Sequence, residues 1–336
     1  MSTSDELLTQ ALKILIDAGV EMSGYEFSLA GGATQATVWK GTSPRDTSAD
    51  VALRLTPKPA QLITRIASLV DGVSDVTCPR TLAVEQMDDG DRRWTVHLCT
   101  WIGTGAPQRP DMRLLGQHLA RLHLAMGRSS IDVTDRRLTF ERNPAPSPDQ
   151  ELPAWYVARN VWRDRIFAWL AVQTEHAVAQ PIHGDLHWGN IVATNTGFGF
   201  IDFDKSMFAP PVFDLAKLIS TGLFSVGEGR ARFQARKTTA LLEGYESLRA
   251  LSAVDLVALE GLAVVLNEET ARLGNVYDDD GYRSNAAAVA DWWITRRRRA
   301  PHDPLGIRSS RQSASPAEVS SEQVPLWPDE DPIEQR

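Results

Sequence analysis

The sequence predicts an α+β fold with a small N-terminal lobe built on an antiparallel sheet and a larger, mostly helical C-terminal lobe. Segments with strand character are concentrated between residues 25 and 101, whereas helical spacing of apolar residues dominates from residue 111 onward. Strands grouped in one part of a chain and helices in another are typical of α+β folds. A polar segment over residues 181–220 lies within the helical part and carries the candidate site.

The N-terminal lobe is predicted to begin with a helix over residues 4–18, where apolar residues recur with helical spacing before Gly19. Three strands are predicted between Tyr25 and Leu55, and the small residues 30–34 are predicted to form the turn between the first two. Backbone N–H groups of a glycine-rich turn can bind phosphate groups. A plain hairpin turn is the alternative interpretation.

The rest of this lobe is predicted to contain one helix and one hairpin. Residues 60–70 have helical character, and residues 81–84 and 94–101 are predicted as two strands joined by a turn that contains Gly90. The glycine-containing segment 102–107 follows the second strand, and we predict that it is the hinge between the lobes.

The C-terminal lobe is predicted to be built from helices. Asp111 is a predicted N-cap, because a stripe of apolar residues with helical spacing follows it. Further helices are expected over residues 154–175, 212–220, 230–248, 253–273 and 284–299.

Ser, Pro, Glu and Gln dominate the sequence after about residue 304, a composition typical of disordered segments. We therefore predict an N-terminal lobe over residues 1–102, a C-terminal lobe over residues 103–303 and a disordered tail over residues 304–336.

The polar segment has the pattern loop, strand, tight turn, strand and acidic residue. Its two apolar strands, near residues 191–193 and 198–201, are separated by a short turn with a glycine. A two-stranded ribbon of this kind brings its two outer ends together. Asp185 and Asn190 precede the first strand and Asp202 follows the second, so the three side chains are predicted to converge at the open end of the ribbon.

Two carboxylates and an amide oxygen form a hard, all-oxygen site that suits Mg²⁺ bound to phosphate groups. An Asp beside such a metal, without being its ligand, can accept a proton from a hydroxyl nucleophile. Phosphoryl transfer requires these parts. The pattern therefore predicts Asp185 as the proton acceptor, with Asn190 and Asp202 as metal ligands.

The motif H-G-D-x-x-x-x-N over residues 183–190, followed by I-D at 201–202 and D-x-A at 214–216, resembles the catalytic segment of aminoglycoside phosphotransferases, choline kinases and related small-molecule kinases. The resemblance implies a bilobal, protein-kinase-like fold. It also implies transfer of the γ-phosphate of ATP, with Mg²⁺, to a hydroxyl of a small molecule. An aminoglycoside or related amino-sugar antibiotic is the first expected acceptor, which would give the chain a role in antibiotic resistance. A hydroxyamino acid, a choline-like alcohol or a sugar is the alternative.

The resemblance implies roles for further residues. The implied nucleotide-binding positions are Gly31, Gly32, Thr34, Arg54, Thr100 and Ile102. His183 and Asp214 are implied to support the catalytic loop, and Glu268 and Glu269 to bind a cationic acceptor. Arg54 stands where many family members have Lys, and the helix predicted after it lacks the Glu that usually pairs with that cation.

Other interpretations of the polar segment are open. His183, Asp185 and His187 have a spacing that resembles transition-metal ligands of metallohydrolases, although such sites generally take more His or Cys from elsewhere. A catalytically degenerate kinase that binds nucleotide and serves as an interaction protein is a further alternative. A buried hairpin with incidental polar residues is disfavoured, because buried unpaired charge is costly.

The composition excludes several classes of protein. Only two cysteines, Cys78 and Cys99, occur among 336 residues, which excludes a disulfide framework and favours a cytoplasmic location. The first residues lack the basic and apolar regions of a signal peptide, and no apolar run is long enough to span a membrane. The formal net charge of −8 argues against a nucleic-acid partner and is compatible with a cationic small acceptor. We expect a monomer or a homodimer.

Overall fold

The computed structural model describes residues 4–33, 36–43, 46, 49–90, 92–103, 105, 107–131, 170, 178–227, 230–276 and 280–299. These residues form two compact units. The first draws its described residues from Met1–Pro110, Arg121–Arg136 and Gly189–Ser206, and the second from Asp111–Ala120, Arg137–Trp188 and Met207–Arg336. The lobe boundaries expected from the sequence remain predictions.

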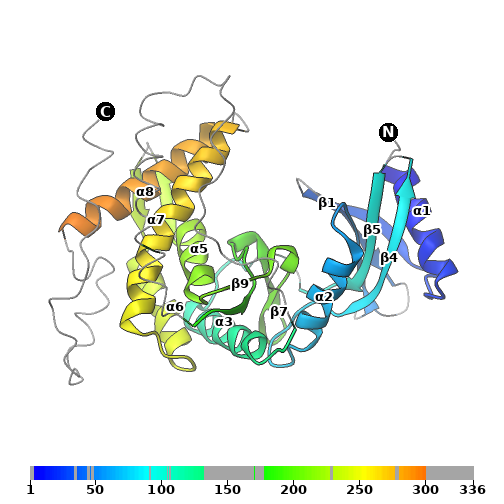
Figure 1. Cartoon of the computed structure of the whole chain (residues 1–336), viewed down its shortest axis with the longest axis horizontal. Helices are drawn as coiled ribbons and strands as arrows, with labels where there is room; N and C mark the ends of the chain where they lie inside the picture. The colour runs from blue at the N-terminus through cyan, green and yellow to red at the C-terminus, as the bar shows by residue number, and fades with distance from the viewer. Residues whose placement is uncertain are drawn as a thin grey trace. The chain divides into compact units, whose positions relative to one another are not determined.

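The first unit is built on a five-stranded antiparallel sheet with the strand order β1-β2-β3-β5-β4 (Figure 1). The strands are β1 (Glu26–Ala33), β2 (Ala36–Thr42), β3 (Val51–Thr56), β4 (Thr81–Asp89) and β5 (Arg92–Thr100). Consecutive strands pair as hairpins except where β3 joins β5, and helix α2 (Ala60–Asp71) lies between those two in sequence. The sheet predicted for the N-terminal part of the chain is confirmed.

Strand β1 continues through the glycines that were predicted to form a turn, so that prediction is wrong. Gly31 lies opposite Val38 and Gly32 opposite Thr37, and the register shifts between Leu29 and Gly31. The shift absorbs one extra residue as a β-bulge, and glycine is tolerated beside a bulge because it has no side chain to pack. The hairpin therefore extends beyond the glycines.

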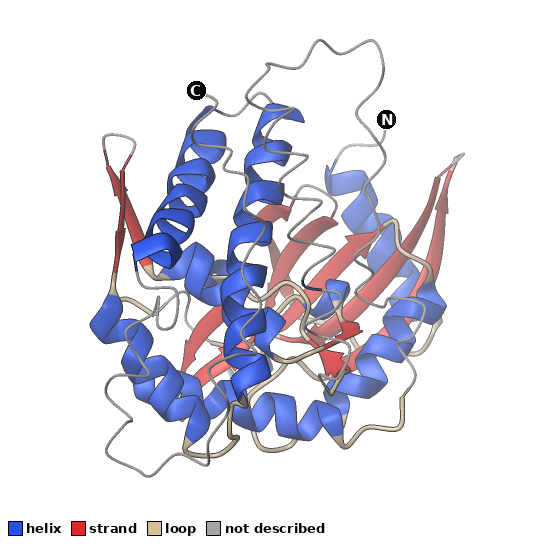
Figure 2. Ribbon diagram, turned by 60° about the vertical axis from the view of Figure 1, so that its left-hand side comes forward, coloured by secondary structure: helices blue, strands red, loops and turns tan. Residues whose placement is uncertain are grey.

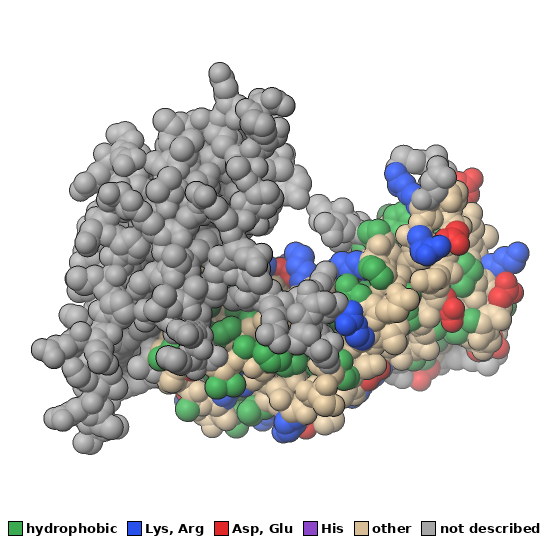
Figure 3. Space-filling view, viewed as in Figure 1, with side chains coloured by type: hydrophobic (Ala, Val, Ile, Leu, Met, Phe, Trp, Pro, Cys, Tyr) green, Lys and Arg blue, Asp and Glu red, His purple; other side chains and the backbone are tan. Residues whose placement is uncertain are grey.

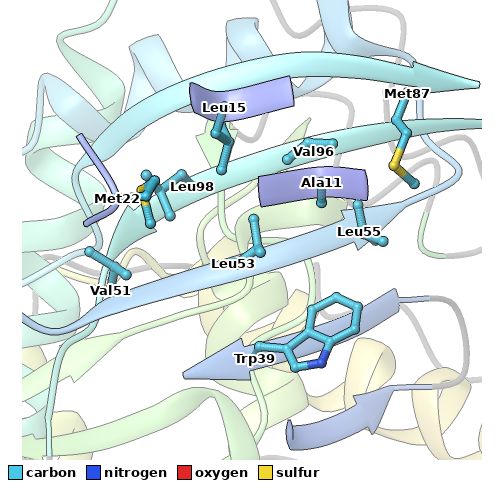
Figure 4. Packing of buried hydrophobic residues seen from close by; sticks show 10 residues of the cluster. All are labelled: Ala11, Leu15, Met22, Trp39, Val51, Leu53, Leu55, Met87, Val96 and Leu98. Carbon is cyan, nitrogen blue, oxygen red and sulfur yellow. The ribbon is translucent and has the colours of Figure 1, made fainter. Parts of the chain in front are cut away.

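The core of the first unit lies between helix α1 (Ser4–Asp17) and one face of the sheet. Ala11 and Leu15 of α1 pack with Leu53 and Leu55 of β3, and Figure 4 shows these side chains together with six further members of the cluster. Side chains of a strand alternate between its two faces. Arg54 therefore points to the opposite face, and Figure 1 shows α1 and α2 on opposite sides of the sheet.

The predicted ribbon is present in the first unit. Strands β7 (Ile191–Thr194) and β8 (Gly197–Phe200) pair antiparallel, with Ile191 opposite Phe200. Short 3₁₀ turns flank the ribbon, η2 (Trp188–Asn190) before it and η3 (Phe203–Lys205) after it.

The segment predicted to be a hinge packs against this ribbon. Gly103 has a φ of 76°, and a Cβ atom there would lie 2.6 Å from the side chain of Val192. The N–H of Ala193 donates to the carbonyl of Gly105 at 2.9 Å. Only glycine combines this left-handed backbone with so close an approach.

The second unit is mostly helical (Figure 2). Its described elements are the first part of α3 (Met112–Gly127), β6 (Gln180–Ile182), β9 (Met207–Ala209), α5 (Val212–Gly222), β10 (Phe224–Gly227), β11 (Arg230–Phe233), α6 (Ala235–Glu246), α7 (Ala253–Val276) and α8 (Asp280–Arg299). Asp111 caps α3 as predicted, because its Oδ1 accepts the N–H groups of Arg113 and Leu114 at 3.0 and 3.1 Å. Helices α3 and α6 cross closely, since a Cβ at Gly116 would lie 2.0 Å from the carbonyl oxygen of Leu241.

For the helix predicted over residues 230–248, the predicted first residue is wrong. Residues 230–233 form strand β11, which pairs with β10, and helix α6 begins only at Ala235. The rings of Phe224 and Phe233 lie 5.1 Å apart between centroids with a tilt of 39°, a contact across the paired strands of this hairpin.

Two expectations fall on residues outside the described ranges, namely the helix over 154–175, of which only Leu170 is described, and the tail over 304–336. Among the described helices, none has the length and apolar character needed to cross a lipid bilayer. On the face shown in Figure 3, acidic and basic side chains of the first unit are interspersed.

Candidate active site

Asp214 fixes the backbone of the predicted catalytic loop. It lies in the first turn of α5, is fully buried, and accepts the N–H of His183 on Oδ2 and the N–H of Gly184 on Oδ1, each at 2.9 Å. Gly184 has a φ of 78°, a conformation that favours glycine. Two charge-assisted hydrogen bonds thus hold the residues immediately before Asp185.

Replacing Asp214 by Asn is expected to lower the free energy of unfolding by about 2–4 kcal/mol, because the amide oxygen can accept only one of the two buried N–H groups and the amide nitrogen faces the other as a second donor. Urea denaturation monitored by circular dichroism measures this change. Asp111→Asn is the matched control, since Asn caps a helix as well as Asp does. Equal losses in the two variants would contradict the role given to Asp214.

Asp185, the predicted proton acceptor, is a buried residue of the second unit. Its N–H donates to Nδ1 of His183 at 3.3 Å, and its carboxylate Oδ1 forms an ion pair with the ammonium group of Lys217. Lys217 was not among the residues predicted from the sequence. Its position in the D-L-A-K stretch, three residues after Asp214, would have identified it as a residue of the same helix turn.

The predicted metal ligands Asn190 and Asp202 lie at the open end of the ribbon in the first unit. The N–H of Ile201 donates to the carbonyl of Asn190 at 3.0 Å, so the two side chains leave the backbone at neighbouring positions. Asp202 has a φ of 63°, and in the described part of the chain it is the one residue other than glycine with a positive φ. Non-glycine residues held in this region cluster at functional sites.

Arg54 of β3 binds the carboxylates that follow the ribbon. Its guanidinium donates to Oδ1 of Asp202 at 2.9 Å and to Oδ1 of Asp204 at 3.1 Å, and the ammonium of Lys58 lies 3.2 Å from Oδ2 of Asp204. The family's helix Glu is absent here, and Asp71 at the end of α2 accepts the N–H of Thr81 instead. The buried carboxylate of Asp204 is therefore the ion-pair partner of Arg54.

The charges of Arg54, Lys58, Asp202 and Asp204 stabilise one another. Burial alone would lower the pKa of Arg54, but the carboxylates of Asp204 and Asp202 outweigh it and leave that pKa raised. Burial alone would raise the pKa of the Asp204 carboxyl, but Arg54 and Lys58 outweigh it and hold that pKa below its usual range. Asp204 is thus anionic and fully engaged, whereas the side chain of Asp202 is 37% exposed.

His97 lies opposite Arg54 in the sheet and is a titratable neighbour of this group. Burial, followed by the charge of Arg54, lowers the pKa of His97 from 6.5 to about 4. The imidazole of His97 binds a proton near pH 6.5 in the unfolded chain but only near pH 4 in the folded protein. The unfolded state therefore gains protons first, and the free energy of unfolding is expected to fall as pH decreases from about 6.5 to 4, by about 2 kcal/mol at pH 5.

Urea denaturation at pH 7.5 and pH 5 measures this dependence in the wild type and in His97→Gln, which is expected to lose most of it. His118→Gln controls for removal of a histidine from the same unfolded chain. An unchanged difference between the two pH values in His97→Gln would contradict the assignment.

The remaining predicted nucleotide-binding residues differ in what they offer. The N–H of Thr100 donates to the carbonyl of Arg80 at 2.9 Å, whereas Ile102 makes no backbone hydrogen bond within the described part of the chain. Gly31 and Gly32 lie in strand β1, and Thr34 falls outside the described residues. Glu268 and Glu269 belong to helix α7, but their side chains are outside the described part.

Residues 28–251 match the model of the phosphotransferase enzyme family known as APH. The chain belongs to this family. Among curated proteins that are similar in sequence, the homoserine kinase of Rhodospirillum rubrum is 30% identical over 204 residues, which cover 56% of this chain and 60% of that protein. The homoserine kinase of Hyphomonas neptunium is 27% identical over 181 residues, or 50% of this chain and 55% of that protein. The matches thus span less than two thirds of either relative.

Solved structures similar to this APH-family chain include an amicoumacin kinase in complex with AMP-PNP and Ca²⁺ (TM-score 0.64, 14% identity, 86% of this chain and 96% of that one). A choline/ethanolamine kinase family protein from Mesorhizobium loti has a TM-score of 0.59 at 18% identity and covers 92% of this chain and 99% of its own. The GDP complex of aminoglycoside 2'-phosphotransferase-IIIa has a TM-score of 0.58 at 13% identity, covering 84% and 96%. The predicted α+β, protein-kinase-like fold is confirmed.

The transition-metal interpretation gains no support from the described ranges of this APH-family member. Within them, no three His, Cys, Asp or Glu side chains form a group suited to holding a metal ion.

Proposed function

We propose that the chain is an ATP-dependent phosphotransferase that moves the γ-phosphate to a hydroxyl group of a small molecule. The observation that carries this proposal is the family match over residues 28–251, a range that contains Asp185, Asn190 and Asp202. The loop before Asp185 is fixed by Asp214, and Asn190 and Asp202 share one end of the ribbon. Positioning and charge neutralisation are the main demands of phosphoryl transfer.

In this proposal, Asp185 accepts the proton of the acceptor hydroxyl and aligns its oxygen. Arg54 and the backbone of Gly31 and Gly32 contact the phosphates of ATP, and the backbone of Ile102 holds the adenine edge. His183 supports Asp185, because Nδ1 of its ring accepts the backbone N–H of Asp185.

Asn190 and Asp202 are the residues that would hold Mg²⁺. Their amide and carboxylate oxygens are hard ligands that fit this ion. Arg54 occupies Oδ1 of Asp202, and a carboxylate has further lone pairs to offer. When bound, the ion supplies positive charge against the phosphate oxygens.

For the acceptor, we propose a hydroxyamino acid of the homoserine type. Both curated relatives are homoserine kinases, at 30% and 27% identity. The similarity to antibiotic and choline kinases lies between 13% and 18% identity and supports only the fold. The aminoglycoside acceptor, the cytoplasmic location and the monomeric or homodimeric state remain predictions from the sequence.

Formation of ADP with a panel of acceptors tests the acceptor class. The panel contains L-homoserine, L-serine, choline, glucose and kanamycin, each with ATP and Mg²⁺. We expect kcat/KM to be highest for L-homoserine. Turnover with kanamycin but not with the amino acids would restore the antibiotic interpretation, and bound nucleotide without turnover would favour the degenerate-kinase alternative.

A further inference from the structure

Lys217 is the cation that helix α5 places against the predicted proton acceptor. Its ammonium forms an ion pair with Oδ1 of Asp185, and the side chains of the two residues are 22% and 10% exposed. The neighbours of Lys217 on α5, from Val212 to Ser220, are otherwise buried. The helix thus places the partly exposed ammonium of Lys217 beside a row of buried side chains, in contact with Asp185.

This pair matters for the charge that an acceptor can carry. When Asp185 accepts a hydroxyl proton, its negative charge is neutralised, and the ammonium of Lys217 loses its counter-charge. A cationic acceptor would then add a second positive charge near Lys217, and like charges at close range repel each other. An acceptor with an anionic group would replace the lost counter-charge, and an ammonium carries three N–H donors, so Lys217 can bind a second oxygen beside Asp185.

Within the described part of the second unit, the carboxylate that contacts the loop before Asp185 is that of Asp214. Asp214 is fully buried and uses both of its oxygens on the N–H groups of His183 and Gly184. Trp188 packs against α5 one turn after Lys217, where a Cβ at Gly222 would lie 3.3 Å from the indole ring. The described contacts of Asp185 and of the loop before it thus include the ammonium of Lys217, the ring of His183 and the engaged carboxylate of Asp214.

We infer that Lys217 is a specificity-determining residue that binds the carboxylate of a hydroxylated carboxylic acid whose hydroxyl group is directed to Asp185. This inference rests on the proposed function and reverses the cationic acceptor expected from the sequence. It predicts that the acceptor's carboxylate, rather than its ammonium group, determines recognition.

L-Homoserine and L-homoserine amide form a matched pair of probes, because they differ only in replacing the carboxylate by a neutral carboxamide. The wild-type protein is expected to favour the acid by ~10–10²-fold in kcat/KM, the range for a hydrogen bond to a charged group. Lys217→Met is expected to bring the ratio close to one, and Lys217→Arg to retain most of it. Lys237→Met removes an exposed lysine from α6 and is expected to behave as the wild type.

Calorimetric titration of the same two probes in the presence of AMP-PNP separates this inference from the proposed function. If no acceptor yields ADP, phosphotransfer fails, yet a Lys217-dependent preference for binding the acid still supports the inference. An acid-to-amide ratio that is unchanged in Lys217→Met, a wild-type preference for the amide, or binding of neither probe would overturn it.

Discussion

Asp185→Asn is expected to lower kcat by ~10²-fold or more while ATP binding stays close to the wild-type value. The amide cannot accept the hydroxyl proton, but it is nearly isosteric with the carboxylate and keeps a hydrogen-bonding oxygen for Lys217. The hydrogen bond from the backbone of residue 185 to His183 does not involve the side chain. Steady-state kinetics and titration with a fluorescent ATP analogue measure the two quantities separately.

Asp88→Asn is the matched control for this experiment. Asp88 forms an ion pair with Arg93, and both side chains are more than 70% exposed, so its removal is expected to change little. A kcat within a factor of about two of the wild type in Asp185→Asn would remove the proton-acceptor role. A parallel loss of ATP binding would indicate a structural effect instead.

The second large effect is expected from the two acidic residues of the Ile-Asp-Phe-Asp run, which have different partners. Asp202→Asn is expected to lower Mg²⁺-dependent turnover by ~10²-fold or more. The neutral amide is a weaker ligand for Mg²⁺, and a bound metal ion stabilises the charge of the transition state by several kcal/mol. Its fold should be retained, since Arg54 keeps Asp204 as a partner.

Asp204→Asn serves as the comparison, because the same change two residues later removes the buried partner of both Arg54 and Lys58. The expected result is a loss of about 3 kcal/mol in the free energy of unfolding, as for breaking a buried ion pair. Turnover as a function of Mg²⁺ concentration and urea denaturation distinguish the variants. An Asp202→Asn protein with wild-type Mg²⁺ dependence would refute the metal assignment.

The sequence was sufficient for features that depend on local spacing. The ribbon of β7 and β8 follows from two short apolar strands around a glycine turn, and the cap at Asp111 follows from an acidic residue before an apolar stripe. Strand β11 was also detectable in principle. Its residues alternate between exposed and partly buried positions over four residues, but the longer helical signal that begins at Ala235 concealed them.

The pairings between distant residues were not predictable from such patterns. Arg54 and Asp204 are separated by 150 positions, and Asp185 and Lys217 by 32. Helical or strand periodicity reports which face a residue occupies and carries no information on its partner in another element. The absent helix Glu indicated only that the usual partner of Arg54 was missing, and the structure was needed to identify Asp204 as its replacement.

Phosphorus NMR of the complete reaction tests the central claim most directly. With ATP, Mg²⁺ and the acceptor panel, the wild-type protein is predicted to produce a phosphomonoester resonance that grows in a one-to-one ratio with ADP and is nearly absent with Asp185→Asn. Bound nucleotide with no phosphomonoester from any acceptor, or inorganic phosphate as the sole product beside ADP, would contradict it.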